Sequence, residues 1–163
     1  MESITDLVIA ISNPARSLQY KRQHICTKTM EVISFTNRVS LWAFNESLTQ
    51  IECLMCLEQK NNVFSSGQIL AKTNYPDYFD AILAQQVLVA SDARNHPSTR
   101  CFNDSYFIPN DIQSLLDYVL IKDNRPMGVI CCEAIGKKNQ WLESDVVTLR
   151  RIANITAIFF EQD

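Results

Sequence analysis

The sequence changes its hydrophobic period near residue 37, and this change limits the folds that are open to the chain. Over residues 16–36 the apolar positions recur at helical spacing. From residue 38 the chain reads "RVSLWAFN", which is rich in β-branched and aromatic residues, and after the turn "NESL" it continues as "TQIECLMCLEQ". Two such runs joined by a short polar turn predict a β-hairpin over 38–59. A helix followed by a hairpin indicates a mixed fold.

The remaining segments extend this series of helices and strands. The elements that we expect, in chain order, are helices at 3–11 and 16–36, strands at 38–45 and 49–59, a loop at 60–76, a helix at 76–86, a strand at 87–93, strands at 114–121 and 127–135 around the turn "KDNRP", and a helix opened by Trp141 or Ser144. An antiparallel sheet with helices gathered at both termini is an α+β fold. We expect a single domain over 1–163, with N-terminal helices at 1–36, a sheet and pocket insert at 38–136, and a C-terminal signalling helix at 141–162.

The C-terminal helix carries an apolar stripe that we assign to Val147, Ile152, Ile155 and Phe159. Phe159 and the adjacent Phe160 would lie partly uncovered on a monomer. Two explanations stay open at this point. Either the chain is an excised part of a longer sensor, or the helix completes a dimer interface.

Composition and charge narrow the function classes. The 163 residues are 47% hydrophobic and 20% charged, which is typical of a globular domain with a buried core. The net charge of −3 gives no electrostatic support for binding nucleic acid or an anionic membrane. No apolar run reaches the roughly 18 residues of a transmembrane helix, and the N-terminus lacks the basic leader of a signal peptide. We expect a cytoplasmic protein with no nucleic-acid or membrane partner.

The six cysteines are expected to be reduced and mostly buried, because the chain is long and shows no secretory leader. Cys53 and Cys56 form a Cys-x-x-Cys pair, but their strand-like flanks predict that they point to opposite faces. The adjacent Cys131 and Cys132 are predicted to face apart in the same way. Only two histidines are present, and no second ligand pair has zinc spacing. We therefore predict no metal site, and the residues indicate no particular cofactor.

Alternation along the predicted strands separates an apolar face from a mixed one. The mixed face combines polar, acidic and aromatic side chains from three strands, namely Ser40, Trp42, Phe44, Asp117, Cys131 and Glu133. A face of this kind suits a ligand pocket. Two carboxylates there can hold a cationic ligand, or one of them can have a raised pKa. Alternatively, one of the acids pairs with Arg94 or Arg100 and anchors a loop.

The most chemically dense stretch is "SDARNHPSTRCF" at 91–102, which connects a predicted strand to a helical turn. Cysteine–histidine catalysis and a metal site are both disfavoured there, because nothing marks an oxyanion hole and too few ligands gather. Asp92 and Pro97 suit a turn and a helix start, whereas Cys101 and Phe102 are expected to pack inward. The candidates for ligand or anchor contacts are the three basic residues Arg94, His96 and Arg100.

The whole chain from about residue 3 resembles a GAF domain, through a set of stretches that occur in the family's order and spacing. They are "RVSLWAFNE" (38–46), "SSGQIL" with "YPDYFDAIL" (65–83), "ASDARNHPSTRCF" (90–102), "SLLDYVLI" (114–121), and "MGVICCEAIGKKNQW" followed by an aspartate (127–145). The resemblance is greatest to GAF domains that precede diguanylate cyclases, phosphodiesterases or sensor histidine kinases in bacterial signalling proteins. It implies a central antiparallel sheet of five to six strands, with the terminal helices on one face. Loops and short helices would close a pocket on the other face.

The same resemblance implies a cytoplasmic sensory module without catalytic residues. Such a module binds a small molecule or a partner, dimerises through its terminal helices and signals through them to an output module. The expected pocket residues are Trp42, Phe44, Arg94, His96, Arg100, Tyr106, Asp117, Cys131 and Glu133, with Tyr106 as a cap. The alternatives are a GAF-fold enzyme that reduces free methionine-R-sulfoxide through Cys101 and Cys131, and a thiol- or haem-based redox sensor. The cyclic-nucleotide and bilin-attachment motifs of the family do not appear.

Overall fold

The computed structural model describes residues 2–160 and has helices near both ends of the chain, with a central sheet between them in the sequence. The helices are α1 (Glu2–Ser12), α2 (Leu18–Val32), α3 (Pro76–Gln85) and α4 (Glu143–Ile158). The strands are β1 (Arg38–Phe44), β2 (Gln50–Glu58), β3 (Val63–Ser65), β4 (Ile69–Ala71), β5 (Val87–Ala90), β6 (Ile112–Lys122) and β7 (Arg125–Ile135). A 3₁₀ turn at Arg100–Phe102 runs into a π-helical turn at Asn103–Phe107, and we call these two turns together the cover segment. A further 3₁₀ turn lies at Lys60–Asn62.

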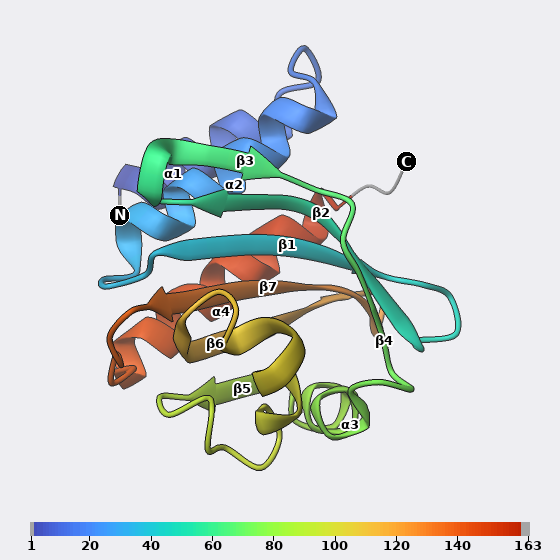
Figure 1. The fold of residues 1–163 in the computed structure, drawn as a ribbon. Coiled ribbons are helices and arrows are strands. Elements are labelled where there is room, and N and C mark those ends of the chain that lie inside the picture. The colour runs from blue at the N-terminus through green and yellow to red at the C-terminus, as the bar shows by residue number, and fades with distance from the viewer. Residues whose placement is uncertain (1, 161–163) are drawn as a thin grey trace.

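All strand pairs are antiparallel, and the sheet order is β3-β2-β1-β7-β6-β5, with β4 also paired to β2 (Figure 1). The expected hairpins of β1 with β2 and of β6 with β7 are both present. The segment expected to be a loop at 60–76 instead supplies the three-residue strands β3 and β4, so the sheet has seven strands. The turn-forming residues "NN", "SSG" and "TN" border these strands and keep them too short to show a clear alternating pattern.

Local signals at the helix ends agree with the sequence. The Ser17 hydroxyl accepts a hydrogen bond from the Tyr20 amide at 3.1 Å, which caps the start of α2. Pro76 occupies the first turn of α3, and Gln86 ends that helix in the left-handed conformation with φ 65°. A carboxylate oxygen of Asp145 accepts a hydrogen bond from the Leu142 amide at 2.8 Å and so helps α4 to begin.

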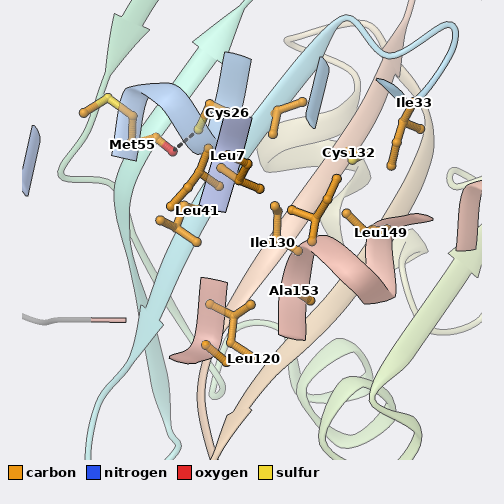
Figure 2. Close-up of a cluster of buried hydrophobic side chains, with 14 of the residues drawn as sticks. Leu7, Cys26, Ile33, Leu41, Met55, Leu120, Ile130, Cys132, Leu149 and Ala153 are labelled. Carbon is orange, nitrogen blue, oxygen red and sulfur yellow. Dashed lines mark hydrogen bonds between the residues drawn. The ribbon is translucent and has the colours of Figure 1, made fainter. Parts of the chain in front are cut away.

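The terminal helices α1, α2 and α4 cover one face of the sheet, as expected (Figure 1). A continuous apolar core fills the space between them and the strands. Figure 2 shows Ile130 and Cys132 of β7 facing Leu149 and Ala153 of α4, with Leu41 of β1 in the same cluster. These side chains are almost fully buried and closely packed. A displacement of β7 would therefore require the helical layer to shift or repack.

The apolar stripe predicted for α4 is placed wrongly. The buried residues of this helix are Leu149, Ile152, Ala153, Thr156 and Ala157, which repeat at helical spacing. Of the predicted set, only Ile152 is fully buried, Ile155 is half-buried, and Val147 and Phe159 are 39% and 37% exposed. The prediction favoured large side chains, whereas the close approach of α4 to the sheet selects alanines.

The end of α4 also differs from expectation. The helix stops at Ile158, and the chain then turns so that Phe160 is buried against the helical core instead of being uncovered. Gly128 of β7 makes this possible, because a Cβ there would lie 3.2 Å from the Phe160 ring and 2.1 Å from the Trp42 carbonyl oxygen. The last residues of the predicted signalling helix, 161–162, lie outside the described part of the chain.

The opposite face of the sheet is covered by α3 and by the chain between β5 and β6, which includes the cover segment (Figure 1). A second apolar cluster lies there, formed by aromatic side chains from α3 and the cover segment against β1, β6 and β7. The predicted division of β1, β6 and β7 into a helix-facing and a pocket-facing side is therefore correct. Val39 and Leu41 belong to the first cluster, and Trp42 and Phe44 to the second.

A β-bulge in β2 corrects the prediction for the Cys-x-x-Cys pair. Leu41 is opposite Met55 and Trp42 is opposite Cys53, so Leu54 is an extra residue in β2. The extra residue shifts the alternation, and both Cys53 and Cys56 are buried in the pocket-side cluster. Cys131 and Cys132 do face opposite sides, as predicted.

Among residues 2–160, no helix combines the length and the hydropathy that crossing a membrane requires.

Candidate functional site

A small cavity lies between the sheet and its aromatic cover. Its volume is about 20 Å³, which is enough for roughly one water molecule. Its walls come from β1, β2, β4, α3, the cover segment, β6 and β7, and are formed by Trp42, Ile51, Leu70, Tyr78, Phe102, Tyr106, Phe107, Leu115, Asp117, Cys131 and Glu133. Five of the nine predicted pocket residues line it, namely Trp42, Tyr106, Asp117, Cys131 and Glu133.

Strand register brings the two acids together on the floor of the cavity. Asp117 of β6 is directly opposite Cys131 of β7, and Glu133 follows Cys131 by two residues on the same face. The two acids are therefore diagonal neighbours, with Cα atoms about 7–8 Å apart in such a pair. Both side chains are buried, at 2% and 1% exposure. The alternation visible in the sequence is sufficient to predict this pairing.

The cation beside these acids is Arg38, the first residue of β1 and a direct cross-strand partner of Glu133. Its Nη1 lies 2.7 Å from Oε1 of Glu58, and its Nε lies 3.7 Å from Oε1 of Glu133. Its guanidinium also stacks over the Tyr106 ring at 5.3 Å from the ring centroid. Sequence reasoning missed Arg38, although the alternation through Ser40 and Trp42 places it on the pocket face.

Two tyrosine hydroxyls donate to the acids from the cover. Tyr78 of α3 donates to Oδ2 of Asp117 at 2.5 Å, and Tyr106 of the cover segment donates to Oε1 of Glu133 at 3.0 Å. Tyr106 therefore caps the cavity with its ring and hydroxyl, as predicted. Tyr78 was expected only to pack in the core, and no local pattern in "YPDYF" separates its ring from that of Phe79.

The second oxygen of each acid has no hydrogen-bonding partner within the described residues. These atoms are Oδ1 of Asp117 and Oε2 of Glu133, and both are buried. Burial raises the pKa of Asp117 to about 7, although the bonds from Cys131 and Tyr78 act to lower it. Burial likewise raises the pKa of Glu133 to about 7, against the lowering effect of Arg38. The site is therefore a buried, acidic and incompletely satisfied cluster.

The basic residues predicted for the pocket lie outside the cavity. Arg94 donates from Nε to the Ile112 carbonyl at 3.0 Å and from Nη2 to Asp111 at 3.1 Å, so it anchors the loop that leads into β6. Arg100 is exposed and does not line the cavity. The alternative in which either arginine pairs with Asp117 or Glu133 is therefore wrong, because Arg38 takes that place.

The other predicted residues of this region support the local chain. His96 accepts a hydrogen bond at Nδ1 from the Ser98 amide at 3.1 Å and so stabilises the turn before the cover segment. Asp92 bonds Asn95 and pairs with Lys138 at 3.2 Å, which is a turn role as expected. Phe44 is buried next to the cavity, edge-to-face with Phe79, without lining it.

Side-chain hydrogen bonds of Thr99, directly before the cover segment, and of Asn103 within it attach the segment to the preceding loop. The Thr99 hydroxyl donates to the Ala93 carbonyl at 2.6 Å, and the Asn103 amide donates to the Arg94 carbonyl at 2.8 Å. Phe102 is buried at its centre and stacks on Tyr75 at 4.4 Å between ring centroids. Cys101 is half-buried instead of facing fully inward.

Neither the cysteine thiols nor any cluster of metal-ligating side chains forms a second candidate site in the described part of the chain. All six cysteines are free, and no group of three or more histidine, cysteine or acidic side chains is arranged to hold a metal ion. Burial raises the pKa of Cys53 to about 12 and raises the pKa of Cys56, Cys101 and Cys131 as well. Such thiols are weak nucleophiles at neutral pH.

Comparisons with known proteins agree with this architecture. The model of the GAF domain family matches residues 22–159. The GAF domain of an Acinetobacter phosphoenolpyruvate-protein phosphotransferase superposes with a TM-score of 0.75 at 11% identity, over 97% of this chain and 90% of that one. The chromophore-binding domain of Stigmatella aurantiaca phytochrome P1 superposes with a TM-score of 0.73 at 10% identity, over 99% of this chain and 59% of that one.

A third similar structure is the GAF domain of Thermosynechococcus elongatus PixJ in its blue-light absorbing form, with a TM-score of 0.71 at 12% identity, over 97% of this chain and 86% of that one. At these identities the likeness shows the fold. The chain spans 58% and 59% of the two Stigmatella aurantiaca chromophore-binding domains that it matches. A search of curated proteins found no match.

Proposed function

The chain belongs to the GAF family, and from this premise we propose that it is a non-catalytic sensory module. It binds a small molecule in the cavity between β6, β7 and the cover segment, and it signals through its terminal helices. The observation that carries the proposal is the pair of buried acids with unpartnered oxygens inside an aromatic enclosure. Burying such groups is unfavourable unless they are bonded, and a ligand that bonds them supplies the missing stabilisation.

The size of the cavity supports a switch. Because its volume is about 20 Å³, a small molecule enters only when the cover segment moves away from the sheet. The ligand then stabilises a conformation that is sparsely populated without it. The apparent affinity of the ligand is therefore lower than its affinity for the open state, because only a small fraction of the ligand-free protein is open.

The route to the output runs through β7. Cys131 and Glu133 face the cavity, whereas Ile130 and Cys132, their immediate neighbours, face Leu149 on α4 (Figure 2). A ligand that displaces the cavity side of β7 therefore shifts the strand against the helical core.

The helical layer also offers a surface for a second copy of the chain. Val147 and Ile158 lie about three turns apart on one face of α4 and are 39% and 63% exposed. On the adjacent α1, Ile9 is 62% exposed. We propose a cytoplasmic homodimer through α1 and α4, coupled to an output module such as a cyclic-di-GMP enzyme or a histidine kinase. The similar structures include a phytochrome chromophore-binding domain and the GAF domain of a phosphotransferase, and this variety supports the proposal that such a domain can serve different output modules.

The proposal is tested by native mass spectrometry of the protein as purified, followed by an NMR screen of a fragment library of mixed charge. We expect a retained small molecule, or fragment-induced shifts that concentrate on the Trp42 indole, Cys131 and the amides of the cover segment. Shifts that appear only elsewhere, or no binding by any fragment class, would contradict a sensory cavity at this place.

A further inference from the structure

We propose that the ligand of this cavity is a small organic cation with at least two N–H donors, such as a guanidinium or amidinium compound. Asp117 and Glu133 would bind the donors through their unpartnered oxygens, while the aromatic walls would stack on the cation. This inference rests on the proposed sensory function and names its ligand class.

The charges around the cavity point to a missing cation. Two acids line it, and within residues 2–160 the only basic side chain that contacts either of them is Arg38, whose Nη1 is bonded to the more exposed Glu58 at 2.7 Å. Its Nε stays 3.7 Å from Glu133 and makes no hydrogen bond among the described residues. One shared arginine does not neutralise two buried carboxylates together with Glu58. A proton or a bound cation must supply the rest.

The positions of the unpartnered oxygens favour an organic cation over a metal ion. A hard divalent cation needs about six oxygen ligands, and no metal-binding group of side chains is present among residues 2–160. The cavity instead offers two carboxylate oxygens within a wall of rings that includes Trp42, Phe102 and Tyr106. Asp117 and Glu133 are diagonal neighbours on adjacent strands. Their oxygens therefore suit a planar group whose N–H donors point in different directions.

The bound cation would replace protons. Both acids have a pKa of about 7 because they are buried, so without a ligand each is partly protonated at neutral pH. A cation that needs both carboxylates charged must release those protons, and its affinity rises with pH by about tenfold per acid between pH 6 and 8. The other charged or titratable groups facing the pair come from β1, β2, β7, α3 and the cover segment, and are Arg38, Cys53, Cys56, Glu58, Cys131, Tyr78 and Tyr106. The cysteines and tyrosines of this set, having raised pKa values, stay neutral over this range.

The test uses methylguanidinium, its neutral isostere N-methylurea, and acetate, each titrated into the wild-type chain at pH 6 and pH 8 and followed by NMR. We expect methylguanidinium to shift the Trp42 indole and Cys131 resonances and to bind at least about tenfold more tightly at pH 8. N-methylurea should bind more weakly, with an affinity that does not depend on pH, and acetate should not bind.

Isosteric variants locate the effect. Asp117→Asn and Glu133→Gln, tested separately, should each weaken methylguanidinium binding by about tenfold or more. The control Glu52→Gln removes the same charge from an exposed position on β2 and should change nothing. The wild-type pH dependence needs no variant and stays decisive if a substitution prevents folding.

The outcomes separate the two proposals. Binding of N-methylurea or acetate to the same resonances without binding of methylguanidinium overturns the cation and leaves the sensory cavity intact. Binding of methylguanidinium that is independent of pH, or unaffected by both variants, also overturns the cation site. Absence of binding by all three probes and by the wider fragment library overturns both proposals.

Discussion

At the scale of single residues, Arg38 determines how much charge the cavity can carry. It touches Glu58, Glu133 and the Tyr106 ring, and so connects the sheet to the cover segment. Alternation along β1 would have predicted its direction, but its partners depend on the register of β1 with β2 and β7, which no local pattern encodes. Asp117 and Glu133 were predictable because each lies on an otherwise apolar strand, whereas the role of Tyr78 depends on the packing of α3.

Replacing Arg38 with methionine should destabilise the protein more at pH 8 than at pH 5. At pH 8 the variant lacks the cation beside Glu133 and has to protonate this buried acid, which from a pKa of about 7 costs on the order of 1 kcal/mol in the free energy of unfolding beyond the loss at pH 5. At pH 5 Glu133 is protonated, because its pKa is about 7 and rises further without the arginine. Urea denaturation at both pH values measures the difference.

The matched control is Arg94→Met, which removes an arginine that pairs with the exposed Asp111. Its loss of stability should be the same at pH 5 and pH 8. An equal loss at both pH values for Arg38→Met would show that Glu133 does not depend on that cation.

Asp117→Asn should stabilise the protein at pH 8 and leave it nearly unchanged at pH 4. The folded-state pKa of Asp117 is about 7, above the usual 3.8, so its stabilising contribution is complete below about pH 4 and is lost as the pH rises through 7. The loss is on the order of 4 kcal/mol, and the variant, which keeps an acceptor for Tyr78, escapes it.

Unfolding free energies of wild type and variant across pH 4–8 measure this effect. Asp92→Asn is the control of opposite sign, because hydrogen bonds from Asn95 and Lys138 lower the pKa of Asp92. A variant Asp117→Asn that is less stable than wild type at pH 8 would contradict a buried, strained acid.

At the scale of elements, the cover segment is the part that has to move. Its two short turns are held to the sheet through Tyr106 and to the preceding loop through Asn103, and Thr99, directly before them, is bonded within that loop. Sequence patterns predicted a helical turn after Pro97, and this is confirmed. The continuation into a π-helical turn at Asn103–Phe107 has no such pattern, and neither has the bulge at Leu54 in β2. Both arise from packing between segments that are distant in the sequence.

Tyr106→Phe should loosen the cover segment without unfolding the domain. The change removes the hydroxyl that donates to Glu133 at 3.0 Å, a bond to an ionisable group worth about 1.5–3 kcal/mol. We expect amide hydrogen exchange over residues 103–107 to become roughly tenfold faster at pH 8.

Tyr75→Phe provides the matched comparison. It removes a hydroxyl that contacts Ser105 in the same segment at 2.8 Å, but in an exposed position, so exchange should change by less than about twofold. Equal acceleration in the two variants would mean that the bond to Glu133 does not hold the cover.

At the scale of the whole molecule, the α+β architecture follows from the sequence, because helical and alternating periods occupy separate segments. The pocket face and the helical face were correctly assigned from β1, β6 and β7. The residues of α4 and the chain end that pack against the sheet were not correctly assigned. The buried stripe of α4 runs through Ala153 and Ala157, and the chain turns back after the helix to bury Phe160. Small buried residues and a terminal turn carry too little local signal.

Ile158→Lys should weaken the proposed homodimer. Its side chain is 63% exposed on α4, and a lysine placed in an apolar interface raises the dimer dissociation constant by at least about tenfold. Sedimentation velocity over a range of concentrations measures this constant. Ile69→Lys, at a 53% exposed position on β4, is the control and should leave the dimer unchanged. A wild-type chain that stays monomeric at high concentration would contradict the dimer.

The central claim is that two buried acids with incomplete partners form the heart of a ligand site. It is tested most directly by a carboxyl ¹³C NMR titration of Asp117 and Glu133 in the ligand-free protein. The pair should titrate in two coupled steps around pH 7, since burial raises the pKa of both groups to about 7. Titration of both carboxyls near their usual pKa of about 4 would show that the cavity is open to water and contradict the account.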